Sequence, residues 1–144
     1  MQGVSFKFSS DPRHAADFDL LVVSDDGGDH GNDSWNYLAE LETSGWKIYD
    51  LGNMNVHPRE ILDRGIMFAR DRKKWAVYSH SGHFMYGIRL AVFRGEADCE
   101  KIGFVHFNDL GRHLIRMDKR GVIFDWPEGF HDQRDKVFKE MHRI

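Results

Sequence analysis

The sequence predicts one α/β domain: a small, mostly parallel sheet with flanking helices, followed by C-terminal β-hairpins and a terminal helix. Apolar runs of strand length alternate with segments of helical periodicity between residues 18 and 96, in the order strand, helix, strand, helix, strand, helix. The 144 residues are few for two average domains, and the apolar share of 41% is enough to bury one core. A single domain over residues 1–144 is therefore expected.

The first strand and the first helix are expected on either side of an acidic, glycine-rich loop. Residues 18–26, "FDLLVVSDD", form an apolar run that ends in acids, which is typical of a buried strand. The loop "GGDHGND" follows, and its glycines allow the chain to turn with positive φ. Asp33 or Ser34 can cap the helix "SWNYLAELETSG", which Gly45 then ends.

Two further pairs of strand and helix follow. Residues 46–52 form a short alternating strand, and Pro58 suits the first turn of a helix that covers residues 58–74. Residues 75–81, "WAVYSHS", form the third strand, and residues 83–95 form the third helix.

The chain changes in character beyond this α/β core, which covers residues 18–96. Residues 101–126 contain three short strand-like runs with turns at "NDLG" and "DKRG", which predicts a β-meander or a pair of hairpins. Residues 127–144 begin as a turn fixed by Pro127 and Gly129 and end as a helix.

Composition narrows the functional classes. A formal net charge of −3 gives no overall basic footprint, so nucleic acid is not an expected partner. The single cysteine, Cys99, excludes an internal disulfide and a cysteine-based zinc site, and it is expected to pack in the core. No apolar run approaches the roughly 20 residues of a membrane span, and no signal peptide is visible. The expected location is the cytoplasm, with no membrane partner.

The ends of the three core strands carry the best candidates for a functional site. Right-handed crossovers place the ends of parallel strands along one edge of a sheet, where open α/β proteins bind their ligands. Asp25, Asp26, Asp50, Ser79 and His80 are therefore expected near one another. Carboxylates favour Mg²⁺ or Mn²⁺, so Asp25, Asp26 and Asp50 are candidate metal ligands. A solvated acidic loop without a metal is the alternative.

Histidines supply another candidate metal site. His80 and His83 lie three residues apart, and with His57 or His30 they would form a zinc site. Histidines that cap a helix or bond a neighbouring backbone group are the alternative. Two other kinds of site are excluded, because the chain has neither a "GxxxxGK[ST]" P-loop nor a "GxSxG" nucleophile elbow.

Two motifs resemble a family of ATPases. Residues 55–96, "NVHPREILDRGIMFARDRKKWAVYSHSGHFMYGIRLAVFRGE", resemble the carboxyl half of bacterial ATP-binding-cassette (ABC) ATPases of the SMC/RecF-like class, as found in phage-defence loci. In that family a Walker B strand runs into a "PE-x-HLHP" turn and a helix, and a further strand ends in "THS-x-H". Residues 115–133 are similar to the family's "DWPEGFFD"-like ending, so the resemblance covers about residues 46–140. It implies an incomplete ABC-ATPase-like lobe.

The resemblance assigns roles to single residues. Asp50 takes the place of the Walker B acid, which would support magnesium through water. Asn53 stands at the position of the catalytic glutamate, and an asparagine cannot accept a proton from the attacking water. His80 matches the switch histidine that would contact the γ-phosphate, and His57 with Pro58 match the "HP" that opens the following helix.

Departures from the family pattern indicate that catalysis is lost. The chain has no Walker A lysine, and "VSDDGGDHGNDSWNYL" is at best an eroded version of the family's signature loop "D-x-G-x-G-x-S-Q". Phosphoryl transfer depends on charges placed around the phosphates, and each lost stabilising group commonly costs about 2.7–4 kcal/mol. The resemblance therefore implies a pseudoenzyme with vestigial Asp50, Asn53 and His80.

The expected function is that of a catalytically inactive ATPase-like accessory or inhibitor protein. It would bind a full-length ABC/SMC-type ATPase, in phage defence or in counter-defence, and a homo-oligomer is also compatible with the resemblance. Trp126, Pro127 and Phe130 are expected to lock the tail, or to form the partner site if they are exposed.

Two alternatives stay open. The strand-end residues Asp25, Asp26, Asp50 and His80 would suit a metal-dependent phosphohydrolase or nuclease, in which case the chain is an enzyme. A split ATPase is the other alternative. There another chain supplies the Walker A loop, and ATP and Mg²⁺ bind only in the presence of that partner, without turnover.

Overall fold

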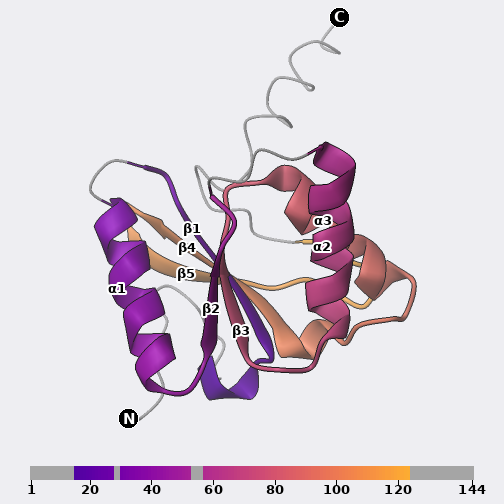
Figure 1. Cartoon of the computed structure of the whole chain (residues 1–144), viewed down its shortest axis with the longest axis horizontal. Helices are drawn as coiled ribbons and strands as arrows, with labels where there is room; N and C mark the ends of the chain where they lie inside the picture. The colour runs from indigo at the N-terminus through magenta and orange to yellow at the C-terminus, as the bar shows by residue number, and fades with distance from the viewer. Residues whose placement is uncertain (1–14, 28–29, 53–56, 124–144) are drawn as a thin grey trace, which may run out of the picture.

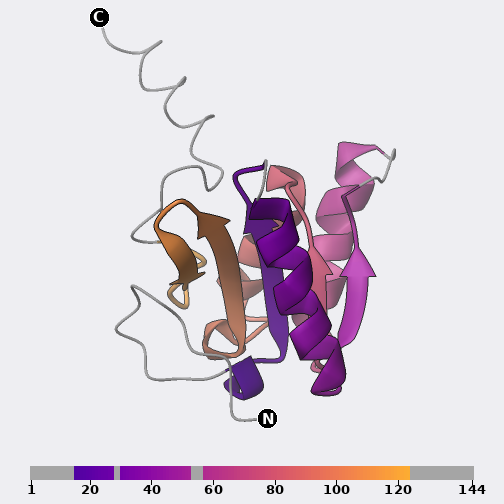
Figure 2. The same ribbon diagram turned by 90° about the vertical axis from the view of Figure 1, so that its left-hand side faces the viewer.

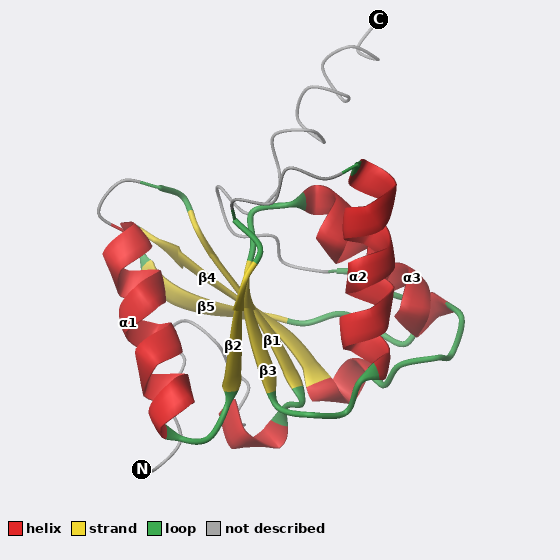
Figure 3. Cartoon of the chain, viewed as in Figure 1, coloured by secondary structure: helices red, strands yellow, loops and turns green. Residues whose placement is uncertain are grey.

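A five-stranded sheet separates one helix from two others in the computed structural model, which describes residues 15–27, 30–52 and 57–123. Helix α1 covers one face of the sheet, and α2 and α3 cover the opposite face (Figures 1 and 3). The elements are η1 (Ala15–Asp17), β1 (Leu20–Asp25), α1 (His30–Thr43), β2 (Lys47–Asp50), α2 (Pro58–Arg70), β3 (Trp75–Tyr78), α3 (Gly82–Phe93), η2 (Cys99–Lys101), β4 (Ile102–Asn108) and β5 (Gly111–Ile115).

The strand order is β2-β3-β1-β4-β5, and the strands β1 to β4 are all parallel. Only β5 is antiparallel, and it pairs with β4. Within the described residues, β2 and β5 form the two edges of the sheet (Figure 2). The predicted fold class, a mostly parallel α/β sheet with flanking helices and a hairpin after it, is confirmed.

Strand β1 lies in the middle of the sheet and is buried along its whole length. Leu20 and Val22 belong to the core under α2 and α3, whereas Leu21 and Val23 belong to the core under α1. A strand that is buried on both faces has a continuous apolar sequence instead of an alternating one. This is why "LLVV" could be recognised as a central strand.

Helix α1 begins at His30, four residues before the start that was expected at Ser34. The expectation that Asp33 or Ser34 caps this helix is wrong, because both residues lie inside it. The hydroxyl of Ser34 is buried and donates to the Asp25 carboxylate at 2.8 Å, so it serves the neighbouring strand end. The other end of the helix is as predicted, since Gly45 follows it with a φ of 98°.

Helix α2 ends at Arg70, four residues before the expected end at Lys74. Asp71 is the C-cap in an extended conformation. The ammonium of Lys74 donates to the carbonyl oxygens of Ala16 and Phe18, which holds this residue outside the helix, directly before β3.

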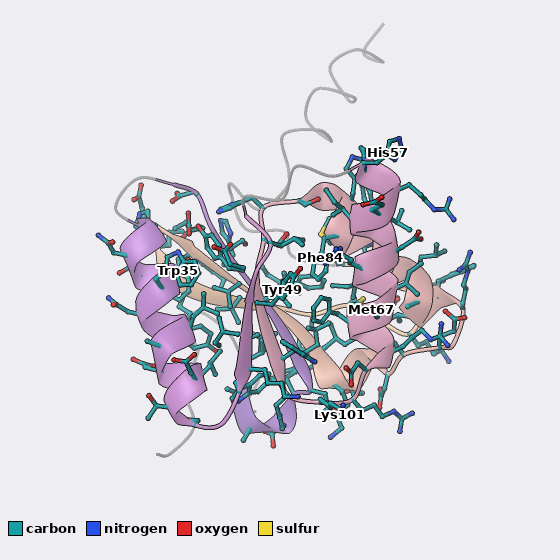
Figure 4. All side chains as sticks on the ribbon, in the orientation of Figure 1. Trp35, Tyr49, His57, Met67, Phe84 and Lys101 are labelled. Carbon is teal, nitrogen blue, oxygen red and sulfur yellow. The ribbon has the colours of Figure 1, made fainter. Side chains whose placement is uncertain are left out.

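Helices α2 and α3 approach each other closely at two glycines. A Cβ atom placed on Gly87 would lie 2.0 Å from the carbonyl oxygen of Leu62, and one on Gly65 would lie 2.2 Å from that of Phe84. Neither distance leaves room for a methyl group, so the two helix backbones are in direct contact. Phe84 fills the space between these helices and the sheet (Figure 4).

Strand β4 differs from the expectation of a separate C-terminal meander. It is buried throughout and pairs in parallel with β1, from Leu20↔Ile102 to Asp25↔Phe107, so it belongs to the central sheet. The hairpin between β4 and β5 is as predicted, and a single bridge, Met117↔Ile123, follows it. The expected turn and helix of residues 127–144 lie outside the described residues.

Candidate functional site

The topological switch point of the sheet lies between β1 and β3. These two strands are neighbours, but the helices that follow them, α1 and α3, cover opposite faces of the sheet (Figure 1). Ligands of open α/β sheets bind at the carboxyl ends of the strands where the connections diverge in this way. The residues that end β1 and β3 are therefore the first place to look for a site.

Asp25 ends β1 at the switch point, and its carboxylate is fully engaged. Oδ2 accepts hydrogen bonds from the hydroxyls of Ser34 at 2.8 Å and Tyr78 at 2.9 Å, and Oδ1 accepts one from the Gly27 amide at 2.9 Å. Burial alone would raise the pKa of Asp25, but these three donors hold the pKa below its ordinary value. Asp25 is thus a buried carboxylate that is negatively charged at neutral pH.

Tyr78 and His80 continue the network from the end of β3. The Tyr78 hydroxyl donates to Asp25, so it accepts from Nε2 of His80, which lies 2.9 Å away. Burial, together with the hydrogen bond to Asp25, raises the pKa of Tyr78 to about 12. The hydroxyl therefore keeps its proton at neutral pH and links the imidazole to the buried carboxylate.

Trp35 covers this network, although sequence analysis gave it no role in a site. It projects from α1 toward the sheet, and its ring centroid lies 4.9 Å from that of Tyr78 (Figure 4). It is 42% exposed, which is unusual for a tryptophan. The signal that could have identified it is the acidic loop directly before it in the sequence, which brings the start of α1 to the switch point.

Asp50 ends the neighbouring strand β2, in register with Tyr78. Its carboxylate is exposed and accepts a hydrogen bond from the Gly52 amide at 2.8 Å. Its charge contributes to the raised pKa of Tyr78. The expected placement of Asp25, Asp50 and His80 at one edge of the sheet is thus observed. Asn53, the other vestigial position, lies outside the described residues.

A second cluster of charges lies beside the switch point. Nε2 of His30 is 2.7 Å from Asp109 Oδ1 and 3.8 Å from Asp26 Oδ1, and Nδ1 is 3.1 Å from Asp33 Oδ2. Hydrogen bonds to Asp109 and Asp33 raise the pKa of His30 to about 9. Asp109 was not anticipated, because it lies in the turn between β4 and β5.

The distances between ligand atoms show which of these side chains could hold one metal ion together. Among the described residues, Asp26, His30 and Asp109 form the group whose ligand atoms lie within 4.8 Å of one another. Neither Asp25 nor Asp50 belongs to that group, although both were candidate ligands with Asp26.

The remaining candidate histidines and the cysteine have other contacts. His57 is the N-cap of α2, where its Nδ1 accepts a hydrogen bond from the Arg59 amide. His83 packs edge to face with the Tyr86 ring. Cys99 is half-buried against the core, as predicted, and burial raises the pKa of its thiol. The three residues of the expected partner patch, Trp126, Pro127 and Phe130, lie outside the described residues.

The segments that follow β1, β2 and β3 at this edge of the sheet carry no lysine or arginine. Residues 24–35, 50–57 and 78–83 contain five aspartates and no lysine or arginine. Two like charges 4 Å apart repel by about 4 kcal/mol at the effective dielectric constant of a protein surface. A polyphosphate placed here would meet the Asp25 carboxylate, and these segments offer it no lysine or arginine. The positive charge of His30 is already paired with Asp26, Asp33 and Asp109.

Comparison of the chain with protein-family models, with curated proteins and with solved structures gave no match. Within the described part of the chain, every helix is too short or too polar to cross a bilayer.

Proposed function

We propose that the chain is a catalytically inactive ATPase-like domain that acts by binding a protein partner, a full-length ATPase of the SMC/RecF-like class. The observation that carries the proposal is the charge at the switch point. There the buried Asp25 carboxylate accepts three hydrogen bonds, and the segments that follow β1, β2 and β3 hold no lysine or arginine. An ATPase needs cationic groups at the phosphates, so this arrangement opposes ATP binding by the chain alone.

The geometry of the vestigial residues supports the same proposal. Asp50 and His80 lie at the ends of neighbouring parallel strands, as the resemblance to a Walker B acid and a switch histidine requires. His80 Nε2, however, is directed to the Tyr78 hydroxyl and lies 3.7 Å from Asp25 Oδ1. The histidine is thus part of an acidic network instead of a phosphate site.

Binding of a protein partner is supported by the open edges of the sheet. Strand β2 has its ends exposed and is paired on one side only by the described residues. An unpaired edge strand presents free backbone donors and acceptors, which favours association with another chain. A cytoplasmic location and a role in phage defence or counter-defence complete the proposal.

Nucleotide titration tests the first half of this proposal. Calorimetry of the purified chain with ATP and Mg²⁺ is expected to show no binding up to about 1 mM, the upper end of ordinary substrate affinities. The same titration in the presence of the candidate partner ATPase separates a split ATPase from a pseudoenzyme. Turnover of ATP by the chain alone would overturn the proposal.

A metal-dependent phosphohydrolase or nuclease is the second candidate. It is favoured by the position of Asp25, Asp26 and Asp50 at strand ends, and by the three-ligand group that contains Asp26. Hydrolysis of a phosphomonoester and of single- and double-stranded DNA, with Mg²⁺ or Mn²⁺, is the assay. This candidate requires activity that Asp50→Asn or His80→Gln abolishes, and an inactive wild-type chain rules it out.

A further inference from the structure

The cluster around His30 brings together three segments that are far apart in the sequence. Asp26 follows β1, His30 is the first residue of α1, and Asp109 lies in the turn between β4 and β5. Each offers one ligand atom, and the three atoms lie within 4.8 Å of one another. Tertiary structure, not sequence proximity alone, therefore creates the group.

The spacing of these atoms suits a small divalent cation. Ligand atoms at 2.0–2.2 Å from a tetrahedral zinc ion are roughly 3.3–3.6 Å apart. Nε2 of His30 is 2.7 Å from Asp109 Oδ1 and 3.8 Å from Asp26 Oδ1, which brackets that range. The ligand oxygens of Asp26 and Asp109 lie within 4.8 Å of each other, so small side-chain movements would bring the three atoms into coordination.

A fourth residue orients the imidazole. Asp33 Oδ2 lies 3.1 Å from Nδ1 of His30, on the opposite side of the ring from Asp26 and Asp109. Histidines that bind metals almost always donate their other ring N–H to a carboxylate or carbonyl, which fixes the ring and its tautomer. With Asp33 in this role, Nε2 is directed between the two remaining carboxylates.

The carboxylates of the cluster outnumber its cations in the part of the chain that the structure describes. Among the described residues, each of the carboxylates of Asp26, Asp33 and Asp109 has His30 as its ionic partner. One imidazole carries at most a single positive charge, so three carboxylates retain a net negative charge around it. By contrast, the exposed acids Asp63 and Glu100 are paired with the guanidinium groups of Arg59 and Arg116.

The cluster also adjoins open space. The side chain of Asp109 is 94% exposed, that of Asp26 is 31% exposed and that of His30 is 23% exposed, so solvent reaches the cluster. A metal held by three protein ligands needs such access, because water or a substrate group completes its coordination.

We propose that Asp26, His30 and Asp109 form a three-ligand binding site for a divalent transition-metal ion, zinc above all, with Asp33 orienting His30. One imidazole with two carboxylates suits zinc better than magnesium, which prefers oxygen ligands alone. The ion would fix the β4–β5 turn to the start of α1, next to the switch point. This inference does not depend on the ATPase-like function, since it uses none of the vestigial residues.

Calorimetry with zinc alone tests the site, on the full chain with any affinity tag removed and after treatment with a chelator. One zinc ion is expected to bind each chain. Asp109→Asn and His30→Gln should each weaken binding at least tenfold, and Asp33→Asn should weaken it about tenfold. Asp63→Asn, in the exposed pair with Arg59, is the matched control and should leave zinc binding unchanged. Titrations with manganese and with magnesium alone rank the metals, and magnesium binding tighter than zinc would overturn the choice of ion.

These variants are informative because their sites are accessible. The side chain of Asp109 is 94% exposed and that of Asp33 is 54% exposed, so both substitutions should leave the fold intact, as circular dichroism will verify. The proposal is overturned if the unaltered chain binds no zinc. It is also overturned if Asp109→Asn and His30→Gln bind zinc as tightly as the unaltered chain, because the ion would then sit on other histidines.

Discussion

Replacing Asp25 by asparagine tests whether the switch-point carboxylate is structural. The substituted amide would keep one carbonyl oxygen, and in either orientation its NH₂ group would face donors: the hydroxyls of Ser34 and Tyr78 that now donate to Oδ2, or the Gly27 amide that now donates to Oδ1. Hydrogen bonds to a charged acceptor contribute about 1.5–3 kcal/mol each. Ser34 has a second acceptor, the Ser24 carbonyl at 3.4 Å, so part of the loss is recovered. We expect Asp25→Asn to lower the free energy of unfolding by about 2–3 kcal/mol.

Urea denaturation at pH 7, followed by tryptophan fluorescence, measures this effect. Asp50→Asn is the matched control, because Asp50 is exposed and accepts one backbone hydrogen bond, and it should cost less than about 1 kcal/mol. Asp25 has a lowered pKa in the folded state, so its contribution is complete above its ordinary pKa of 3.8 and disappears as the pH falls through the folded-state pKa. The reasoning is refuted if Asp25→Asn is no less stable than Asp50→Asn at pH 7.

Three further predictions concern packing and titration. Gly87→Ala should lower the free energy of unfolding by about 1–3 kcal/mol, because the new methyl group would meet a backbone carbonyl. Gly82→Ala, at an open position, should leave the free energy of unfolding unchanged, and urea denaturation of both variants makes the comparison. Tyr78 should lose its proton near pH 12 in an ultraviolet titration, and Tyr78→Phe should remove that step; a normal tyrosine pKa would contradict the hydrogen bond to Asp25. The raised pKa of His30 stabilises the fold fully below pH 6.5 and progressively less as the pH rises through about 9, so the wild-type advantage over His30→Gln in urea midpoint should vanish across that window. A constant difference from pH 6 to 10 would refute it.

The core strands and the mostly parallel α/β fold class could be predicted from the sequence, because a buried strand has a recognisable local run of apolar residues. The run "LLVV" is apolar on both faces, and "WAVY" follows a helix and precedes another. From these, the right-handed crossover rule placed the ends of β1, β2 and β3 at one edge. The sequence of a strand does not show which strands it pairs with. For this reason β4 was predicted to lie in a meander instead of beside β1 in the sheet.

The limits of the first helix illustrate a different difficulty. Glycines in "GGDHGND" indicate a loop, yet α1 already begins at His30. Contacts with residues outside the helix accompany this earlier start: His30 is hydrogen-bonded to Asp109, and Ser34 is hydrogen-bonded to Asp25. Neither contact can be read from local periodicity, so the site residues Asp109 and Trp35 were also missed.

Affinity capture tests the central claim most directly. The tagged chain is expressed in its native host, or in cells that carry its gene neighbourhood, and bound proteins are identified by mass spectrometry against an unrelated tagged domain. A pseudo-ATPase subunit should recover a full-length SMC/RecF-like ATPase, and the purified pair should form a complex whose ATPase rate differs from that of the partner alone. Recovery of no such ATPase, from a chain that elutes as a single monomer or homodimer, would contradict the proposal.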